Sequence, residues 1–114
     1  MQIEITGKTL IAHIDGELDQ HSAANIRREI DKCLRKTGVS NLVLDFTGLQ
    51  FMDSSGIGVI IGRYKIVRSI GGEVVVVSSS ATMDRIITAS GLKRIMTVCK
   101  TVPAAMKKLK GDVS

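Results

Sequence analysis

Apolar and polar residues alternate at the beginning of the chain. Ile3 and Ile5 have polar neighbours, and after Gly7 the alternation continues from Leu10 to Ile14. A period of two residues is typical of a strand that buries one face, and a glycine between two such segments suits a tight turn. The pattern therefore predicts a β-hairpin at the start of the fold.

The rest of the chain alternates between segments with a helical period and short, wholly apolar segments. Serines at N-cap positions and glycines at C′ positions mark several of the helix ends. Apolar runs of a few residues are typical of strands that are covered on both faces. Helices are predicted between Ser22 and Gly38, over roughly 55–70, between Ser80 and Gly91 and from about residue 101, strands at 42–46, 74–77 and 95–98, and loops at 15–21 and 47–54.

This order of elements, β-β-α-β-α-β-α-β-α, indicates an α/β fold. Strands that alternate with helices favour a mostly parallel sheet, here a mixed β-sheet of four to five strands with about four helices. The 114 residues contain no linker, repeat or low-complexity stretch, so we expect a single domain over 1–114. Its core would consist of aliphatic residues, because aromatic residues make up only 3% of the chain.

Charge and hydropathy narrow the class of partner and the compartment. The formal net charge is +5, but the basic residues are spread over several segments and stacking aromatics are scarce, so we expect no nucleic-acid binding. No segment approaches the ~20 apolar residues that span a bilayer, and the N-terminus lacks the pattern of a signal peptide. We therefore expect a cytoplasmic protein without a membrane partner, in which Cys33 and Cys99 are reduced core thiols.

Reactive side chains are too sparse to indicate an enzyme. His13 and His21 lie in no metal-ligand pattern, and the two cysteines are far apart in sequence. Ser54 and Ser55 precede Gly56 at a turn into a helix, but this motif lacks the first glycine of a nucleophile elbow. No histidine follows it to act as the base of a serine hydrolase. We expect no catalytic residue, no metal and no cofactor.

Ser54 has two interpretations at the predicted N-cap of the second helix. A serine there accepts orphan N–H groups and stabilises the helix by about 1 kcal/mol. The same position tolerates the charge of about −1.5 to −2 that phosphorylation adds, because the helix dipole is positive at this end. The residues alone favour the structural cap over the modification site.

The glycines of this helix also leave two interpretations open. Gly56, Gly58 and Gly62 each cost about 1 kcal/mol relative to alanine inside a helix. They either allow close helix packing, for which Gly58 and Gly62 share a face, or they clear the approach of another chain to Ser54. Both explanations are compatible with the spacing.

Acidic residues occur in both predicted loops near this helix. Asp15, Glu17 and Asp19 crowd the first loop, and Asp53 precedes Ser54 in the second. Loops at the carboxyl ends of parallel strands gather at one edge of a sheet, where partners tend to bind. We therefore expect an acidic rim around the serine, which would suit a basic partner and repel a phosphate.

Two segments of the chain resemble the anti-sigma factor antagonist family. They read GELD at 16–19 and FMDSSGIGVIIGRYK at 51–65. The similarity extends over nearly the whole chain, from the hairpin to the last helix, and includes Ser90-Gly91-Leu92. It is greatest to the sporulation members of the family, which antagonise the anti-sigma F factor.

The resemblance implies the fold of a STAS domain and a regulatory role. In the family, the first serine of the Asp-Ser-Ser-Gly motif is phosphorylated, which is Ser54 here, by an anti-sigma factor that is a serine kinase using ATP. The unphosphorylated antagonist binds that kinase and releases the sigma factor, whereas the phosphorylated form does not bind until a serine phosphatase restores it. The aspartate of the first segment, Asp19 here, also matters for the partner contact in the family. The predicted partner-binding residues are Asp19, Asp53, Ser54, Ser55 and Gly56.

Two alternatives stay open at this point. A STAS regulator of a general-stress sigma factor or of a stress-sensing complex would differ only in its partner. A nucleotide-binding domain would be a different class of protein, although the chain contains no Gly-x-x-x-x-Gly-Lys motif. The leading prediction is an antagonist that regulates sporulation transcription and performs no catalysis.

Overall fold

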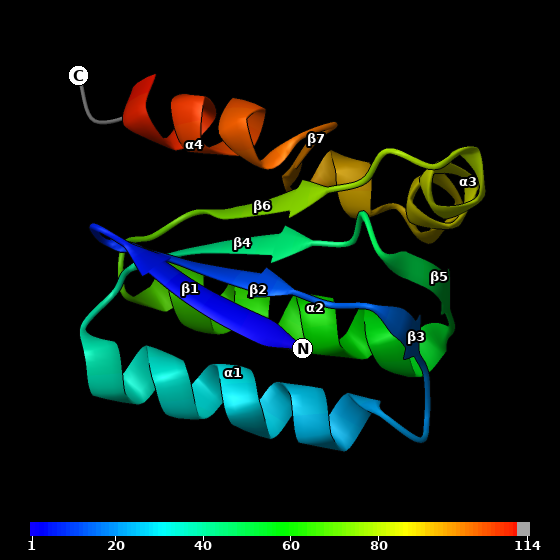
Figure 1. Ribbon diagram of the computed structural model, residues 1–114, viewed down its shortest axis with the longest axis horizontal. Helices are drawn as coiled ribbons and strands as arrows, with labels where there is room; N and C mark the ends of the chain where they lie inside the picture. Colours follow the sequence, from blue (N-terminus) through cyan, green and yellow to red (C-terminus); the bar gives the residue numbers. More distant parts are fainter. Residues whose placement is uncertain (112–114) are drawn as a thin grey trace.

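A five-stranded mixed sheet forms the centre of the computed structural model, which describes residues 1–111 (Figure 1). The strand order is β1-β2-β4-β6-β7, in which β1 runs antiparallel to β2 and the other neighbours are parallel. The five strands and four helices confirm the predicted α/β fold. The bounds are β1 Gln2–Thr6, β2 Thr9–His13, β3 Gly16–Leu18, α1 Ala23–Thr37, β4 Asn41–Asp45, β5 Leu49–Met52, α2 Ser54–Ser69, β6 Val74–Val77, α3 Ala81–Ser90, the 3-10 turn η1 Leu92–Arg94, β7 Thr97–Cys99 and α4 Val102–Gly111.

The predicted hairpin lies at one edge of the sheet. Thr6 pairs with Thr9 across the turn, and Gly7 adopts a φ of +59°, a conformation that favours glycine. Among the described residues, β1 pairs with β2 alone, and it is largely exposed, as is usual for an edge strand.

The helices cover both faces of the sheet. α1 and α2 lie together on one face, and α4 lies on the opposite face (Figure 1). Side chains of β4 alternate between the two layers: Leu42 and Leu44 belong to the larger core, while Val43 belongs to the smaller core with Ala105 and Leu109. β4 and β6 are almost fully buried, which confirms the interpretation of their apolar runs.

Two short strands lie in segments that the sequence predicts as loops. β3 lies within 15–21 and β5 within 47–54, and they pair in parallel as a separate two-stranded sheet. Strands of three and four residues, one of them with a register shift after Gly16, are too short to show an alternating pattern. The loop prediction is therefore wrong for these two segments.

Two predicted boundaries also need correction. α2 begins at Ser54, so that Asp53 and not Ser54 is its N-cap. The last strand begins two residues later than predicted, because η1 follows α3 directly and leaves Ile95 with 44% of its surface exposed. The predicted ends of α1 at Gly38 and of α3 at Gly91 are confirmed.

The structure also describes the two cysteines and the lengths of the helices. Cys33 and Cys99 are free thiols, half-buried, and they pack against the larger and the smaller core, respectively. Within residues 1–111, every helix falls short of the length and apolar character that a membrane crossing requires.

Candidate functional site

The β3–β5 sheet brings together two segments that are far apart in the sequence (Figure 1). Leu18 pairs with Met52 in register, and the Asp53 N–H donates to the Leu18 carbonyl at 3.3 Å. The residues that follow the two strands, Asp19 and Asp53, therefore leave the sheet side by side. The predicted partner-binding residues all lie at this junction, where β5 continues into α2.

The carboxylate of Asp53 holds the junction together. Its Oδ1 accepts the N–H groups of Ser55 at 2.9 Å and Gly56 at 3.3 Å, and so caps α2. Its Oδ2 accepts the Gln20 N–H at 3.3 Å, which ties the segment after β3 to the start of the helix. The capping role predicted for Ser54 is thus performed by Asp53, because the residue before the helix is the one placed to accept these N–H groups.

Ser54 is the first residue of α2, and it is exposed. Within residues 1–111, its hydroxyl makes no hydrogen bond, so it has no part in capping the helix. The N-terminus of the helix places partial positive charge beneath this residue, and the position can therefore carry an anion. The hydroxyl is accessible to another protein.

Asp19 closes the turn that precedes α1. Its Oδ1 accepts the backbone N–H groups of His21 at 2.9 Å and Ser22 at 3.2 Å. The bond from His21 contributes most. Together the two bonds stabilise the charged carboxylate and lower the pKa of Asp19. The Ser22 hydroxyl accepts the Asp19 N–H at 3.1 Å and does not cap α1 with its side chain. Asp19 therefore holds a negative charge in a fixed place beside the Asp53 junction.

The three glycines of α2 have different surroundings. A Cβ on Gly56 would lie 2.6 Å from the Leu18 carbonyl oxygen and would also collide with the side chain of Met52. The close approach of α2 to β3 therefore requires glycine at this position. A Cβ on Gly58 or Gly62 would have no neighbour within 4 Å. Gly56 thus serves internal packing, whereas Gly58 and Gly62 leave open space beside the helix.

That open space is part of a groove of about 430 Å³ between α1 and α2. Buried Arg63 contributes to its lining, and the Arg63 Nε lies 2.8 Å from the Asp31 Oδ1 on α1. This ion pair joins the two helices along the groove. Much of the groove is lined by small residues, so another chain could come close to the helix backbones. These small residues are Ala23, Ala24, Ser55, Gly58 and Gly62.

The exposed face of the β3–β5 sheet combines acidic and aromatic side chains. Glu17 pairs with Phe51 in register, so both side chains leave the same face, and 46% of the Phe51 surface is exposed. Asp15 is also exposed, whereas Asp19 and Asp53 are half-buried and engaged in hydrogen bonds. Of the predicted acidic residues, Asp19 and Asp53 lie at the junction with Ser54 and Glu17 lies on β3, whereas Asp15 lies beside Gly48 at the other end of the two strands. No role was predicted for Phe51, because its strand does not alternate and so shows no outward face in the sequence.

Both histidine rings have carboxylate partners. The His13 ring, at the end of β2, forms hydrogen bonds with Asp45 and Glu4. Burial opposes protonation of His13, but these bonds outweigh it and raise the pKa of the imidazole. The exposed His21 ring lies 3.8 Å from Asp19. Within residues 1–111, no hydrogen bond connects either ring to a serine hydroxyl.

The fold and the serine motif place the chain in a family of regulatory binding domains. A family model described as the STAS domain matches residues 1–105, and the chain belongs to this family. It is 38% identical over 100 residues to the anti-sigma F factor antagonist of Paenibacillus polymyxa, covering 88% of this chain and 86% of that relative. It is 31% identical over 90 residues to the anti-sigma-B factor antagonist of Listeria monocytogenes, covering 75% of this chain and 78% of that relative.

A solved structure shows the same likeness in three dimensions. The Bacillus cell fate determinant SpoIIAA in its phosphorylated form matches this chain with a TM-score of 0.72 and 31% identity, covering 94% of this chain and 96% of that one. The resemblance to the anti-sigma factor antagonist family, predicted from two segments, is confirmed across the fold.

Proposed function

We propose that this protein is an anti-sigma factor antagonist that loses its partner when Ser54 is phosphorylated. The observation that carries the proposal is the exposed Ser54 hydroxyl at the N-terminus of α2, which no hydrogen bond engages within residues 1–111. The proposed partner is an anti-sigma factor with serine kinase activity, and binding of the unphosphorylated protein to it would release the sigma factor. A serine phosphatase acting on phosphorylated Ser54 would restore binding.

The proposed modification needs a second protein to supply the chemistry. The Ser54 oxygen forms a bond to the γ-phosphorus of ATP, the bond from that phosphorus to the bridging oxygen breaks, and ADP leaves. The hydroxyl proton passes to a base of the kinase, because the neighbouring Asp53 carboxylate is engaged in capping α2 and in holding Gln20. Hydrolysis by the phosphatase would return the hydroxyl and release inorganic phosphate.

A phosphate on Ser54 would change the surface without unfolding the protein. The N-terminus of α2 favours a negative charge, so the helix itself tolerates the modification. The new dianion would stand beside Asp53 and near the acidic β3 segment, and it would be strongly hydrated. Covering such a group with a partner costs several kcal/mol unless the partner pairs it. A loss of a few kcal/mol lowers affinity by orders of magnitude.

The proposed contact surface extends on both sides of Ser54. On one side lies the face formed by Glu17 and Phe51, which offers a carboxylate and an aromatic ring to a partner with basic and apolar residues. On the other side lies the groove between α1 and α2, with Ser55 in its wall. Asp19, Asp53 and Gly56, also predicted to bind the partner, would act mainly by shaping this surface.

Calorimetric titration against the anti-sigma kinase tests the proposal. Ser54→Ala should bind as the wild type does and stay unmodified after incubation with kinase and ATP, whereas Ser54→Asp should bind at least about tenfold more weakly. Ser55→Ala is the matched control, and mass spectrometry of its peptides should still locate the phosphate on Ser54. Equal binding by the wild type and both Ser54 variants, or phosphate found on Ser55, would contradict the mechanism.

The pathway is proposed to be sporulation transcription, in the cytoplasm, and the identity of 38% to an anti-sigma F factor antagonist favours it. The similarity to an anti-sigma-B factor antagonist favours a second candidate, a general-stress pathway. The two functions share one mechanism and differ in the kinase. Titration against anti-sigma factors of both types would separate them, because the partner in the cell should bind the unphosphorylated protein far more tightly.

A further inference from the structure

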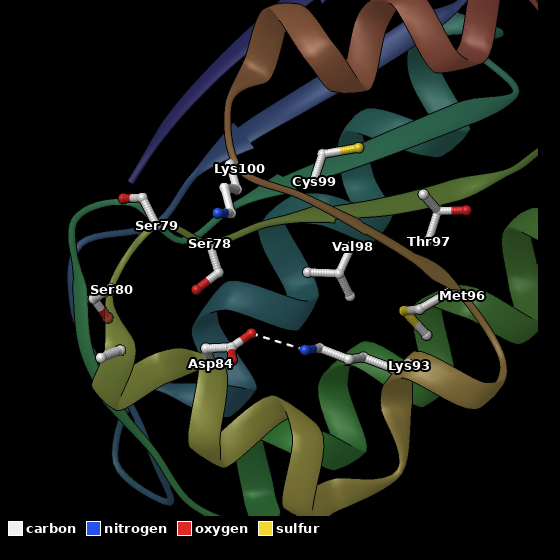
Figure 2. A pocket seen from close by; sticks show the side chains of 11 residues that line it. Ser78, Ser79, Ser80, Asp84, Lys93, Met96, Thr97, Val98, Cys99 and Lys100 are labelled. Atoms are coloured by element: carbon white, nitrogen blue, oxygen red, sulfur yellow. Dashed lines mark hydrogen bonds and ion pairs between the residues drawn. The ribbon is translucent and has the colours of Figure 1, made fainter.

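A second helix N-terminus opens into a pocket at the carboxyl ends of β6 and β7 (Figure 2). The pocket has a volume of about 800 Å³ and lies between the first turn of α3 and β7. The carboxyl ends of parallel strands are where open α/β sheets bind ligands. None of the residues that line the pocket belongs to β3, β5 or α2, so it is separate from the Ser54 junction.

Consecutive backbone N–H groups without acceptors lie at the edge of this pocket. Within residues 1–111, the N–H groups of Ser79, Ser80, Ala81 and Thr82 donate no hydrogen bond. The Ser80 hydroxyl accepts the Met83 N–H at 3.0 Å and so satisfies only the next donor along the chain. With 10 residues, α3 is long enough to present a positive dipole end here. Free N–H groups at such an end favour an anion.

Ser78 gives independent evidence from inside the pocket. The residue is only 7% exposed, and its Oγ has no hydrogen-bond partner within residues 1–111. Its backbone N–H donates to the Cys99 carbonyl at 2.9 Å, which fixes the residue at the end of β6. Figure 2 shows the hydroxyl pointing toward the first turn of α3, on the side of Asp84. Because a buried hydroxyl without a partner costs about 1–3 kcal/mol, a bound acceptor would satisfy a group that the fold leaves unpaired.

Two lysines determine the charge of the pocket. The Lys93 Nζ lies 2.8 Å from the Asp84 Oδ1 and neutralises this carboxylate, the one that lines the pocket among residues 1–111 (Figure 2). Lys100 also lines the pocket and forms no ion pair within residues 1–111. The pocket therefore has a net positive charge in addition to the dipole of α3.

We propose that this pocket binds a phosphate group, either as inorganic phosphate or as the head of a phosphomonoester. The N–H groups of residues 79–82 and the Ser78 hydroxyl would donate hydrogen bonds to the phosphate oxygens, and Lys100 would balance their charge. Met96 and Val98 line the same pocket and would contact the organic part of a monoester. The proposal does not depend on the function assigned to Ser54.

Amide NMR titrations of the full chain with inorganic phosphate and with phenyl phosphate, at constant ionic strength, test this site. We expect saturable shifts at residues 79–82 with a Kd of about 1 mM or lower. Tighter binding of phenyl phosphate would identify a monoester as the ligand class, and equal affinities would identify inorganic phosphate. Shifts that grow without saturation, or that are equally large at the N-termini of α1 and α2, would show general charge screening and overturn the proposal.

Variants separate binding from folding. Ser78→Ala should weaken phosphate binding about tenfold without lowering the Tm, because the lost hydroxyl has no partner in the fold. Lys100→Gln, on an exposed side chain, should weaken binding severalfold without altering packing.

Asp84→Asn should tighten binding severalfold, since it removes a repelling carboxylate and releases Lys93. Ser54→Ala should leave binding unchanged. Wild-type affinity in both Ser78→Ala and Lys100→Gln would show that the site does not exist.

Discussion

The N-termini of α2 and α3 share a backbone geometry and differ in what surrounds them. Each helix follows an extended residue whose side chain accepts N–H groups of the first turn, Asp53 for α2 and Ser80 for α3. The cap of α2 is a carboxylate with acidic residues nearby, whereas the cap of α3 is a neutral hydroxyl in a pocket with two lysines. At the start of α2 the helix dipole favours a further anion while the neighbouring carboxylates oppose it, whereas at the start of α3 the dipole and the lysines both favour it. On the two proposals above, a phosphate attached at the start of α2 would weaken partner binding, whereas a free phosphate group would bind in the pocket at the start of α3.

The largest expected effect comes from disturbing the packing of the first turn of α2. Gly56→Ala would place a Cβ 2.6 Å from the Leu18 carbonyl oxygen, so β3 or the helix must move. We expect a loss of about 3 kcal/mol in the free energy of unfolding, measured by urea denaturation. Gly58→Ala is the matched control, because its Cβ meets open space and alanine should stabilise the helix by up to about 1 kcal/mol. Unchanged stability in Gly56→Ala would contradict the close approach of α2 to β3.

Gly56 also illustrates what the sequence can and cannot predict. The five main strands and four helices follow from local patterns of apolar and polar residues, although β1 is largely exposed and β7 begins later than its pattern predicts. The serine motif likewise locates Ser54 through the resemblance to a family. β3 and β5, however, exist only because they pair with each other, and no local pattern contains that pairing. The packing role of Gly56, the exposure of Phe51 and the bond from Asp53 to Gln20 all depend on this pairing, so none of them was predictable.

A smaller effect should distinguish the two caps directly. Asp53→Ala removes two bonds to the first turn of α2 and the bond to Gln20, whereas Ser80→Ala removes a single bond to Met83. We expect losses in the free energy of unfolding of about 2 kcal/mol and about 1 kcal/mol, respectively, from urea denaturation. Amide hydrogen exchange should also show that only Asp53→Ala loosens Gln20. If Ser80→Ala were the more damaging change, the carboxylate would not be the stronger cap.

The smallest expected effect uses acid to compare the turn before α1, which the Asp19 carboxylate holds, with the start of α3, which the Ser80 hydroxyl holds, because only the carboxylate titrates. The N–H groups of His21 and Ser22 lower the pKa of Asp19 below its ordinary value of 3.8. A carboxyl with a lower pKa in the folded protein contributes stability above its unfolded pKa and loses it as the pH falls through the folded value.

On acidification below 3.8, the hydrogen-exchange protection of the His21 and Ser22 amides should therefore fall before that of the Met83 amide, which Ser80 holds. Asp19→Asn is the control, since an amide side chain can still accept these bonds and does not titrate in this range. In that variant the protection at His21 should no longer depend on acid. Loss of protection at Met83 over the same pH range would instead indicate global unfolding and would contradict a local effect of Asp19.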